Sequence, residues 1–194
     1  MIRSGEMMRA FFCIPLSQTA RDTVSAVATQ LRRETDMRAS WVRPENYHLT
    51  VRFLGEIDPR QTIDLGRIAE EAARRHASFR LSLSRVGAFP SFSRPRVLWM
   101  GDDAPSAFTE LVGDVNDGLG ALGFPPERKA TVAHVTVARI KGRSDPTLDE
   151  KARLLRPSDP ESVDVGRIIL MESRLGPGGA TYTPLYEVSL SGGS

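Results

Sequence analysis

Two of the three histidines in this 194-residue chain occur in the same short pattern, H-x-T-V. His48 is followed by Thr50, and His134 is followed by Thr136, with a valine one position later in both copies. Because imidazole titrates near neutrality, two histidines can act as a general acid and base pair at physiological pH. Hydroxyl groups can hold a phosphoryl group while charge develops on it. These residue types suit in-line attack on a cyclic phosphodiester, in which one group takes a proton from water and another protonates the departing sugar oxygen.

Both copies of the pattern lie in segments that we expect to be β-strands. Side chains alternate faces along a strand, so His48 and Thr50 project to one side while Leu49 and Val51 project to the other. The second copy has the same alternation. The alternative is that both histidines are half-buried strand residues that hydrogen bond to their neighbours. The duplication favours a catalytic pair, since two of only three histidines occupy equivalent positions.

Strands and helices alternate along the chain, and their order repeats. From Arg9 in the first expected strand to His48 is 39 residues, and from Arg96 in the corresponding strand to His134 is 38. Apolar patterning and turn signals indicate the following elements. We expect strands at 9–16, 40–43, 47–54, 78–86, 96–101, 131–140, 163–175 and 182–190, and helices over about 17–35, 58–76 and 105–122, with a further helix opened by Asp145-Pro146.

The repeated order predicts an α+β fold with two pseudo-symmetric lobes. Each lobe is expected to be an antiparallel sheet with helices on the outside, and the two H-x-T-x strands are expected to face a central cleft. We expect a single bilobal domain over 9–190. Within it, repeat 1 spans about 9–90, repeat 2 spans about 96–175, and the final strand is 182–190. A flexible leader (1–8) and a disordered tail (191–194) complete the expected organisation.

Composition excludes several classes of protein. The chain has 26 Lys and Arg against 24 Asp and Glu, so its net charge of +2 favours short or terminal substrates over long duplexes. The lone Cys13 excludes an internal disulfide framework and a cysteine-based zinc site, and three histidines argue against a histidine-rich metal cluster. No segment approaches the length of a membrane span. We therefore expect a cytoplasmic, monomeric protein with no metal, no cofactor and no obligate protein partner.

The sequence resembles the two-histidine (2H) phosphoesterase superfamily, and within it the bacterial and archaeal RNA 2′,3′-cyclic phosphodiesterases, also called 2′-5′ RNA ligase-like proteins. The resemblance rests on WVRPENYHLTVRFLGE (41–56), GAFPSFSRPRVLWMG (87–101) and HVTVAR (134–139), and the order and spacing match over about 9–190. It implies that His48 is the proton donor and His134 the proton acceptor. It also implies metal-independent hydrolysis of a terminal 2′,3′-cyclic phosphate to a 2′-phosphate, on RNA 3′ ends or small cyclic nucleotides. The family usually has phenylalanine and proline at the positions held here by Thr131 and Ala133.

Two arginines are candidates for binding the phosphate beside Thr50 and Thr136. Arg139 matches the arginine that the family uses on phosphate, but it lies five residues after His134. A regular strand would aim it at the opposite face, so a bulge or the strand end must turn it back. Arg52, four residues after the first histidine, has the correct parity in a regular strand. The alternative for Arg52 is a solvated cation at the strand edge.

Aromatic side chains commonly hold the bases of single-stranded RNA ends. Phe89 and Tyr47 are the candidates for this stacking, together with Phe92 and Trp41. Trp99 lies in an apolar strand, and we expect it in the core.

Two other functions are compatible with the same residues. One is a 2′-5′ RNA ligase that joins tRNA halves, because the same acid and base serve the reverse step. The other is a nucleic-acid-binding module with a vestigial site, which the two intact motifs disfavour.

Overall fold

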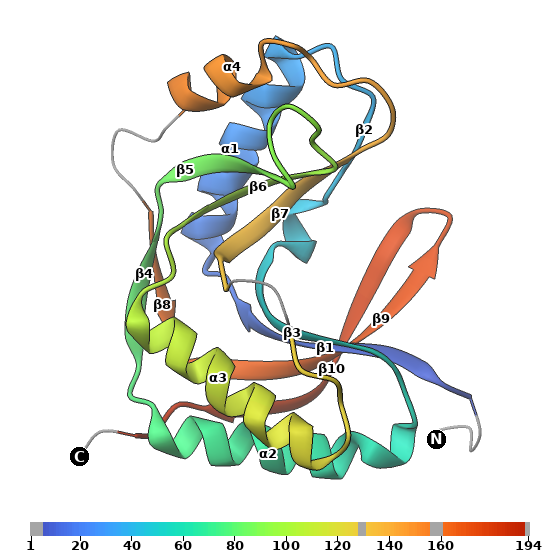
Figure 1. Cartoon of the computed structure of the whole chain (residues 1–194), viewed down its shortest axis with the longest axis vertical. Coiled ribbons are helices and arrows are strands. Elements are labelled where there is room, and N and C mark those ends of the chain that lie inside the picture. Colours follow the sequence, from blue (N-terminus) through green and yellow to red (C-terminus); the bar gives the residue numbers. More distant parts are fainter. Residues whose placement is uncertain (1–5, 128–130, 156–160, 193–194) are drawn as a thin grey trace.

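A computed structural model describes residues 6–127, 131–155 and 161–192 of the chain. Its main sheet has eight antiparallel strands in the order β10-β9-β1-β3-β7-β6-β5, with β2 paired to β7, and a separate two-stranded ribbon joins β4 to β8 (Figure 1). The strands are β1 (Met8–Pro15), β2 (Ala39–Trp41), β3 (His48–Ile57), β4 (Phe79–Leu83), β5 (Arg85–Phe89), β6 (Val97–Asp102), β7 (Ala133–Ile140), β8 (Glu161–Val165), β9 (Arg167–Gly176) and β10 (Gly179–Ser189). The helices are α1 (Gln18–Glu34), α2 (Thr62–Arg75), α3 (Ser106–Ala121) and α4 (Leu148–Leu154), with short 3-10 turns η1 (Pro44–Asn46) and η2 (Pro59–Gln61).

Two groups of strands meet at one point of the main sheet. The pair Leu49 and Val135 joins β3 to β7, and each of these residues directly follows one of the two motif histidines. Helices α2 and α3 pack below the strands β10-β9-β1-β3, whereas α1 and α4 lie beside the strands β7-β6-β5 (Figure 1). The predicted α+β class with two antiparallel lobes is confirmed.

The lobes interleave along the chain. Helix α1 comes from the first half of the sequence but packs against β7, and α3 comes from the second half but contacts β3. Each lobe thus takes one helix from each half. A helix must cover an apolar sheet face, and the exchange of helices ties the halves together.

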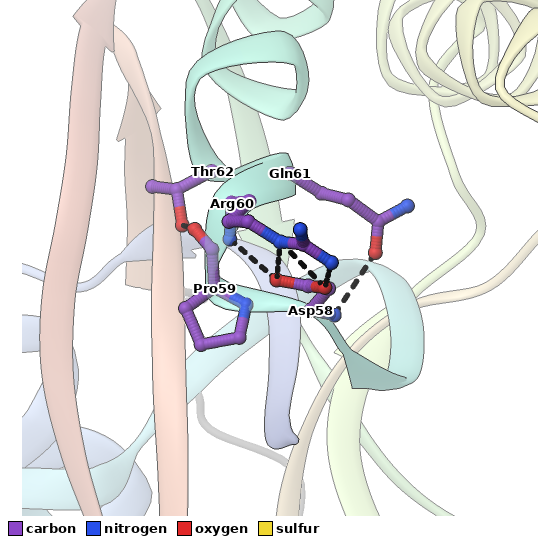
Figure 2. A network of polar contacts seen from close by, with 5 residues as sticks. All are labelled: Asp58, Pro59, Arg60, Gln61 and Thr62. Atoms are coloured by element: carbon purple, nitrogen blue, oxygen red, sulfur yellow. Dashed lines mark hydrogen bonds and ion pairs between the residues drawn. The ribbon is translucent and has the colours of Figure 1, made fainter. Parts of the chain in front are cut away.

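Side chains cap the starts of two helical segments. The Ser17 hydroxyl accepts a hydrogen bond from the backbone N–H of Ala20 at 3.0 Å, and α1 begins at the next residue after the cap. Figure 2 shows the second start, where the Asp58 carboxylate accepts from the backbone N–H of Arg60 and the Gln61 side chain accepts from the backbone N–H of Asp58. This reciprocal capping box begins η2, which leads directly into α2. The third start is later than expected, because Asp145 accepts from the N–H of the residue that precedes α4.

Three predicted elements differ from the structure. The expected strands 78–86 and 163–175 are each divided, at Ser84 and at Gly166, because β4 and β8 leave the main sheet and pair with each other. Part of the expected tail is also ordered, since the backbone N–H of Ser191 donates to Ala73 and that of Gly192 donates to His76. The expected leader (1–8) lies mostly outside the described residues, and its Met8 already belongs to β1. The remaining two residues of the expected tail also lie outside them.

The two faces of β1 belong to different environments. Phe12 and Ile14 are fully buried in the main core, which also contains buried side chains of α2 and α3. Phe11 and Cys13 are buried on the other face, in a small separate cluster with Ile169. That second face also carries His48 of β3. Packing of the main core on one face of the strands therefore fixes the position of the histidine on the other face.

None of the helices in the described ranges is both long and apolar enough to cross a membrane.

Candidate active site

The two motif histidines lie on one face of the joined strands. Their neighbours Leu49 and Val135 pair across β3 and β7 and are fully buried on the core side. Extending this antiparallel register puts His48 opposite Thr136 and His134 opposite Thr50. Both histidines and both threonines are half-buried, on the face opposite to the core. The alternation expected from the sequence therefore holds, and the two motifs are brought together.

Each imidazole is fixed by the same backbone contact. The Nδ1 atom of His48 lies 2.8 Å from the carbonyl oxygen of Asn46, and Nδ1 of His134 lies 2.9 Å from that of Val132. A carbonyl can only accept, so Nδ1 carries the proton in both rings. The other nitrogen, Nε2, is thereby left to accept a proton from a substrate or, once protonated, to donate one.

Burial favours the neutral form of both imidazoles. It is the main cause that lowers the pKa of His48 to about 4, and the positive charges of His134 and Arg139 lower it further, against the opposing effect of the bond to Asn46. The pKa of His134 is also lowered, mainly by burial and then by the charge of Arg139. In the free protein at neutral pH both rings are uncharged.

A β-bulge brings Arg139 to the histidine face. Trp99 pairs with Thr136, but the preceding residue Leu98 pairs with Ala138, so Val137 is the extra residue in β7. The extra residue reverses the alternation beyond it. Arg139, which a regular strand would send to the core face, is exposed on the same side as His134. The bulge that the sequence analysis required is present.

A second bulge in β3 has the opposite consequence for Arg52. Cys13 pairs with Thr50 and Phe12 pairs with Arg52, so Val51 is the extra residue. Arg52 therefore shares the core face with Phe12, and the expectation from strand parity is wrong. Its side chain is only 8% exposed.

The guanidinium of Arg52 makes structural hydrogen bonds. It donates to the Glu127 carboxylate at 3.1 Å and to the carbonyl oxygen of Pro125. These contacts tie the segment that follows α3 to β3. The structure therefore does not bring Arg52 to the histidines, and it also excludes the alternative of a solvated strand-edge cation.

Phe53 occupies the position in β3 that Arg139 occupies in β7. Both follow their histidine by five residues, and both are turned to the histidine face by a bulge. Phe53 pairs with Phe11, their ring centroids are 5.8 Å apart, and the Phe53 side chain is 59% exposed. Phe53 was not among the residues predicted from the sequence, although its spacing from His48 equals that of Arg139 from His134.

Aromatic rings flank each imidazole. Phe11 and Tyr182 lie 4.8 and 5.3 Å from the His48 ring. Phe89 and Trp99 lie 5.0 and 6.0 Å from the His134 ring. Tyr182 was not predicted, because only the pairing of the C-terminal strand β10 with β9 brings it to this face.

The expected aromatic candidates are divided by the structure. Phe89 lies beside His134, whereas Tyr47 is 4% exposed and packs in the main core, where it also contributes to the lining of a cavity beside His48. Trp99 is buried, but on the histidine face and not in the main core. Its indole passes over Gly87, where a Cβ atom would lie 2.1 Å from a ring carbon. That position requires glycine because of the close approach.

Among the described residues, no three His, Cys, Asp or Glu side chains gather closely enough to hold a metal ion. The groups that converge here are instead two neutral imidazoles, two hydroxyls and one guanidinium. These are the groups that acid–base chemistry at a phosphate ester requires.

Comparison with known proteins gives concordant results. The sequence matches the family described as LigT like phosphoesterase over residues 14–99 and 102–182, and each stretch contains one motif histidine. It is 33% identical over 174 residues to the RNA 2′,3′-cyclic phosphodiesterase of Aquifex aeolicus, covering 88% of this chain and 93% of that relative. The protein of the same name from Aeropyrum pernix is 38% identical over 149 residues, covering 76% and 84%. The crystal structure of TT0787 from Thermus thermophilus has a TM-score of 0.80 at 28% identity, covering 95% of this chain and 99% of that one.

Proposed function

The chain belongs to the LigT like phosphoesterase family, within the two-histidine phosphoesterase superfamily, and we propose on this premise that it hydrolyses 2′,3′-cyclic phosphates at RNA ends or on small nucleotides to 2′-phosphomonoesters. Relatives that align over most of the chain bear the name RNA 2′,3′-cyclic phosphodiesterase. The observation that carries the proposal is the pair of imidazoles, both with Nδ1 bonded to a main-chain carbonyl and both on one face beside the Leu49 and Val135 pair.

The proposed reaction is an in-line displacement at phosphorus. Nε2 of His134 accepts a proton from water as the water oxygen forms its bond to phosphorus. The bond from phosphorus to the ribose O3′ breaks, and Nε2–H of His48 donates its proton to that oxygen. The products are a 2′-phosphate and a free 3′-hydroxyl, with one proton taken up by His134 and one released by His48. The acid and base roles follow the family resemblance, because the near-symmetry of the two rings does not distinguish them.

His48 must carry a second proton before it can act as an acid. Its pKa of about 4 in the free protein means that the ring is neutral at pH 7. A phosphate anion within hydrogen-bonding distance favours the imidazolium form and raises the pKa. The substrate therefore brings about the protonation of the residue that acts on it.

The remaining groups are suited to hold the substrate. The Thr50 and Thr136 hydroxyls and the Arg139 guanidinium can donate to the non-bridging phosphate oxygens, where charge accumulates in the transition state. The Phe53 ring is exposed on the same face and can stack on the base of the terminal nucleotide. Phe53 takes the role expected of Tyr47, which is buried in the core.

Substitution of each histidine tests the proposal. We expect His48→Ala and His134→Ala each to abolish hydrolysis of adenosine 2′,3′-cyclic phosphate, with EDTA present and with phosphorus NMR reporting the position of the product phosphate. His76→Gln is the matched control, because its ring contacts Asp114 at 2.8 Å, away from the motif strands. Full activity in either alanine variant would refute the mechanism. RNA binding without turnover by the unaltered protein would support a binding module instead.

A further inference from the structure

A cavity of about 380 Å³ opens beside His48, and its lining does not include His134. It lies between the loop that contains η1 and the β9–β10 hairpin, and its lining includes Phe11 and Cys13 of β1 and Thr181 and Tyr182 of β10. The hairpin projects away from α2 and α3 (Figure 1), and its Tyr182 lies beside the His48 ring. This cavity, the hairpin pocket, is near the lower end of the range of about 300–1,000 Å³ that ligand pockets occupy. Its volume suits a single nucleotide unit.

Asn46 couples the hairpin pocket to the histidine. Its side-chain Nδ2 donates to the carbonyl oxygen of Ala180 at 2.8 Å and so joins the η1 loop to β10. Its own carbonyl oxygen holds Nδ1 of His48. One residue therefore fixes both a wall of the pocket and the ring that borders it. A group bound in the pocket lies directly beside a group bound at His48.

The lining combines an apolar floor with walls that carry two arginines and one glutamate. The half-buried Tyr182 supplies the aromatic surface, and it packs on Phe11, which is 2% exposed, with their ring centroids 5.0 Å apart. Arg21 and Arg43 also line the pocket. The Arg21 guanidinium is held by the carbonyl oxygen of Leu16, whereas the Arg43 side chain is 61% exposed. The contact of Arg43 with the Glu45 carboxylate is long, at 3.9 Å, so its N–H donors are open to an anion.

We propose that the hairpin pocket binds the nucleotide that precedes the cyclic-phosphate end of an RNA chain, with Arg43 contacting the phosphate that links this nucleotide to the terminal one. This inference rests on the proposed function, in which the terminal base lies on Phe53. Phe53 does not line the pocket, so the pocket is left for a second unit of the same strand. An aromatic floor with an arginine at its edge is the combination that recognises single-stranded nucleic acid. An occupied hairpin pocket would make an oligoribonucleotide a better substrate than a mononucleotide.

The test compares two substrates that differ only by the preceding nucleotide. These are adenosine 2′,3′-cyclic phosphate and the dinucleotide ApA ending in a 2′,3′-cyclic phosphate. We expect the unaltered protein to have a higher kcat/KM for the dinucleotide. Arg43→Gln is expected to lower the dinucleotide-to-mononucleotide ratio of kcat/KM about tenfold, chiefly through KM, because a charge-assisted bond to the linking phosphate is lost. Thr181→Trp, which fills the pocket, is expected to lower the same ratio.

Arg67→Gln is the matched control. Arg67 is 70% exposed on α2 and has a comparably long contact with Asp64 of 3.5 Å, but α2 covers the opposite face of the sheet. It should leave both kcat/KM values unchanged.

Three other outcomes would each contradict either this inference or the proposed function. Equal kcat/KM for the two substrates in the unaltered protein would overturn this inference and leave the proposed function intact. An equal loss on both substrates in Arg43→Gln would also overturn it, since the pocket would then hold the terminal nucleotide. Failure of the unaltered protein to hydrolyse either substrate would refute the proposed function itself.

Discussion

The two bulges predict opposite consequences for two arginines that the sequence made candidates for the same phosphate contact. Arg139 is exposed on the histidine face, whereas Arg52 is buried on the core face with its guanidinium bonded to Glu127 and Pro125. We expect Arg139→Met to lose activity and keep its stability. We expect Arg52→Met to lose stability and keep its activity. Methionine preserves much of the length of both side chains, so the comparison isolates the guanidinium.

The expected magnitudes follow from the contacts. Hydrogen bonds to charged groups are worth about 1.5–3 kcal/mol each when buried and less when a partner is exposed. Glu127 is 42% exposed, so the two bonds of Arg52 together contribute about 2 kcal/mol. For a chain of this length that loss lowers Tm by about 4–8 °C. Removing a donor to the developing charge on phosphate costs about 100-fold to 1,000-fold in kcat, which is the expectation for Arg139→Met.

Two measurements on the same preparations decide the question. Thermal unfolding followed by circular dichroism gives Tm, and release of the 2′-phosphate from adenosine 2′,3′-cyclic phosphate gives kcat and KM. The activity of Arg52→Met is measured well below its Tm, so that unfolding does not contribute. A folded Arg52→Met protein with a 100-fold lower kcat, or an Arg139→Met protein with full kcat and a lowered Tm, would refute the assignment of the two faces.

Three further predictions concern packing, protonation and base binding. Gly87→Ala is expected to lower the free energy of unfolding by about 1–3 kcal/mol and to reduce kcat, because the new Cβ overlaps the Trp99 indole beside the catalytic face. Gly113→Ala is the control: its Cβ would meet no atom within 4 Å, so urea titrations should show a free energy of unfolding that is higher by about 0.5–1 kcal/mol. Because the pKa of His48 is lowered in the folded state, the charged form of the ring favours the unfolded chain. The free energy of unfolding should therefore be highest above pH 6.5 and fall by about 3 kcal/mol as the pH drops to 4. In the His48→Gln protein this pH dependence should be weaker. Phe53→Ala should raise KM for adenosine 2′,3′-cyclic phosphate at least fivefold, since stacking on a base contributes about 1–3 kcal/mol.

Each of these predictions has an outcome that contradicts it. Equal stability of Gly87→Ala and the unaltered protein would show that the indole is free to move. An unchanged pH dependence of stability in His48→Gln would mean that the ring is solvated in the folded protein. For the aromatic platform, Ile63→Ala removes an equally exposed apolar side chain from α2, and an identical rise in KM in both variants would argue against base stacking.

The chemistry of the site was largely readable from the sequence. The duplicated H-x-T-V pattern identified His48, Thr50, His134 and Thr136, because the two-residue period of a strand is a local property that fixes which side chains share a face. The same period, with the spacing between the motifs, indicated an antiparallel α+β fold in two lobes. The structure brings all four residues to one face, as that argument expected.

Side-chain alternation along a single strand gave the wrong face where pairing with a neighbouring strand introduces a bulge. Nothing in the sequence marks Val51 or Val137 as the extra residue of a bulge, yet those two positions determine that Arg139 and Phe53 face the histidines and that Arg52 does not. A bulge forms between two strands, so it cannot be read from one of them.

Long-range pairing also decided which aromatic rings surround the site. Tyr182 reaches His48 from a distant part of the sequence because β10 pairs with β9, and β9 with β1. Tyr47, at the C-terminal end of η1, packs in the main core. The sequence by itself determined the reacting groups and their shared face, because side-chain alternation acts within a strand. Only the tertiary structure decided which cation and which rings join them, because that depends on contacts between strands that the chain brings together from distant positions.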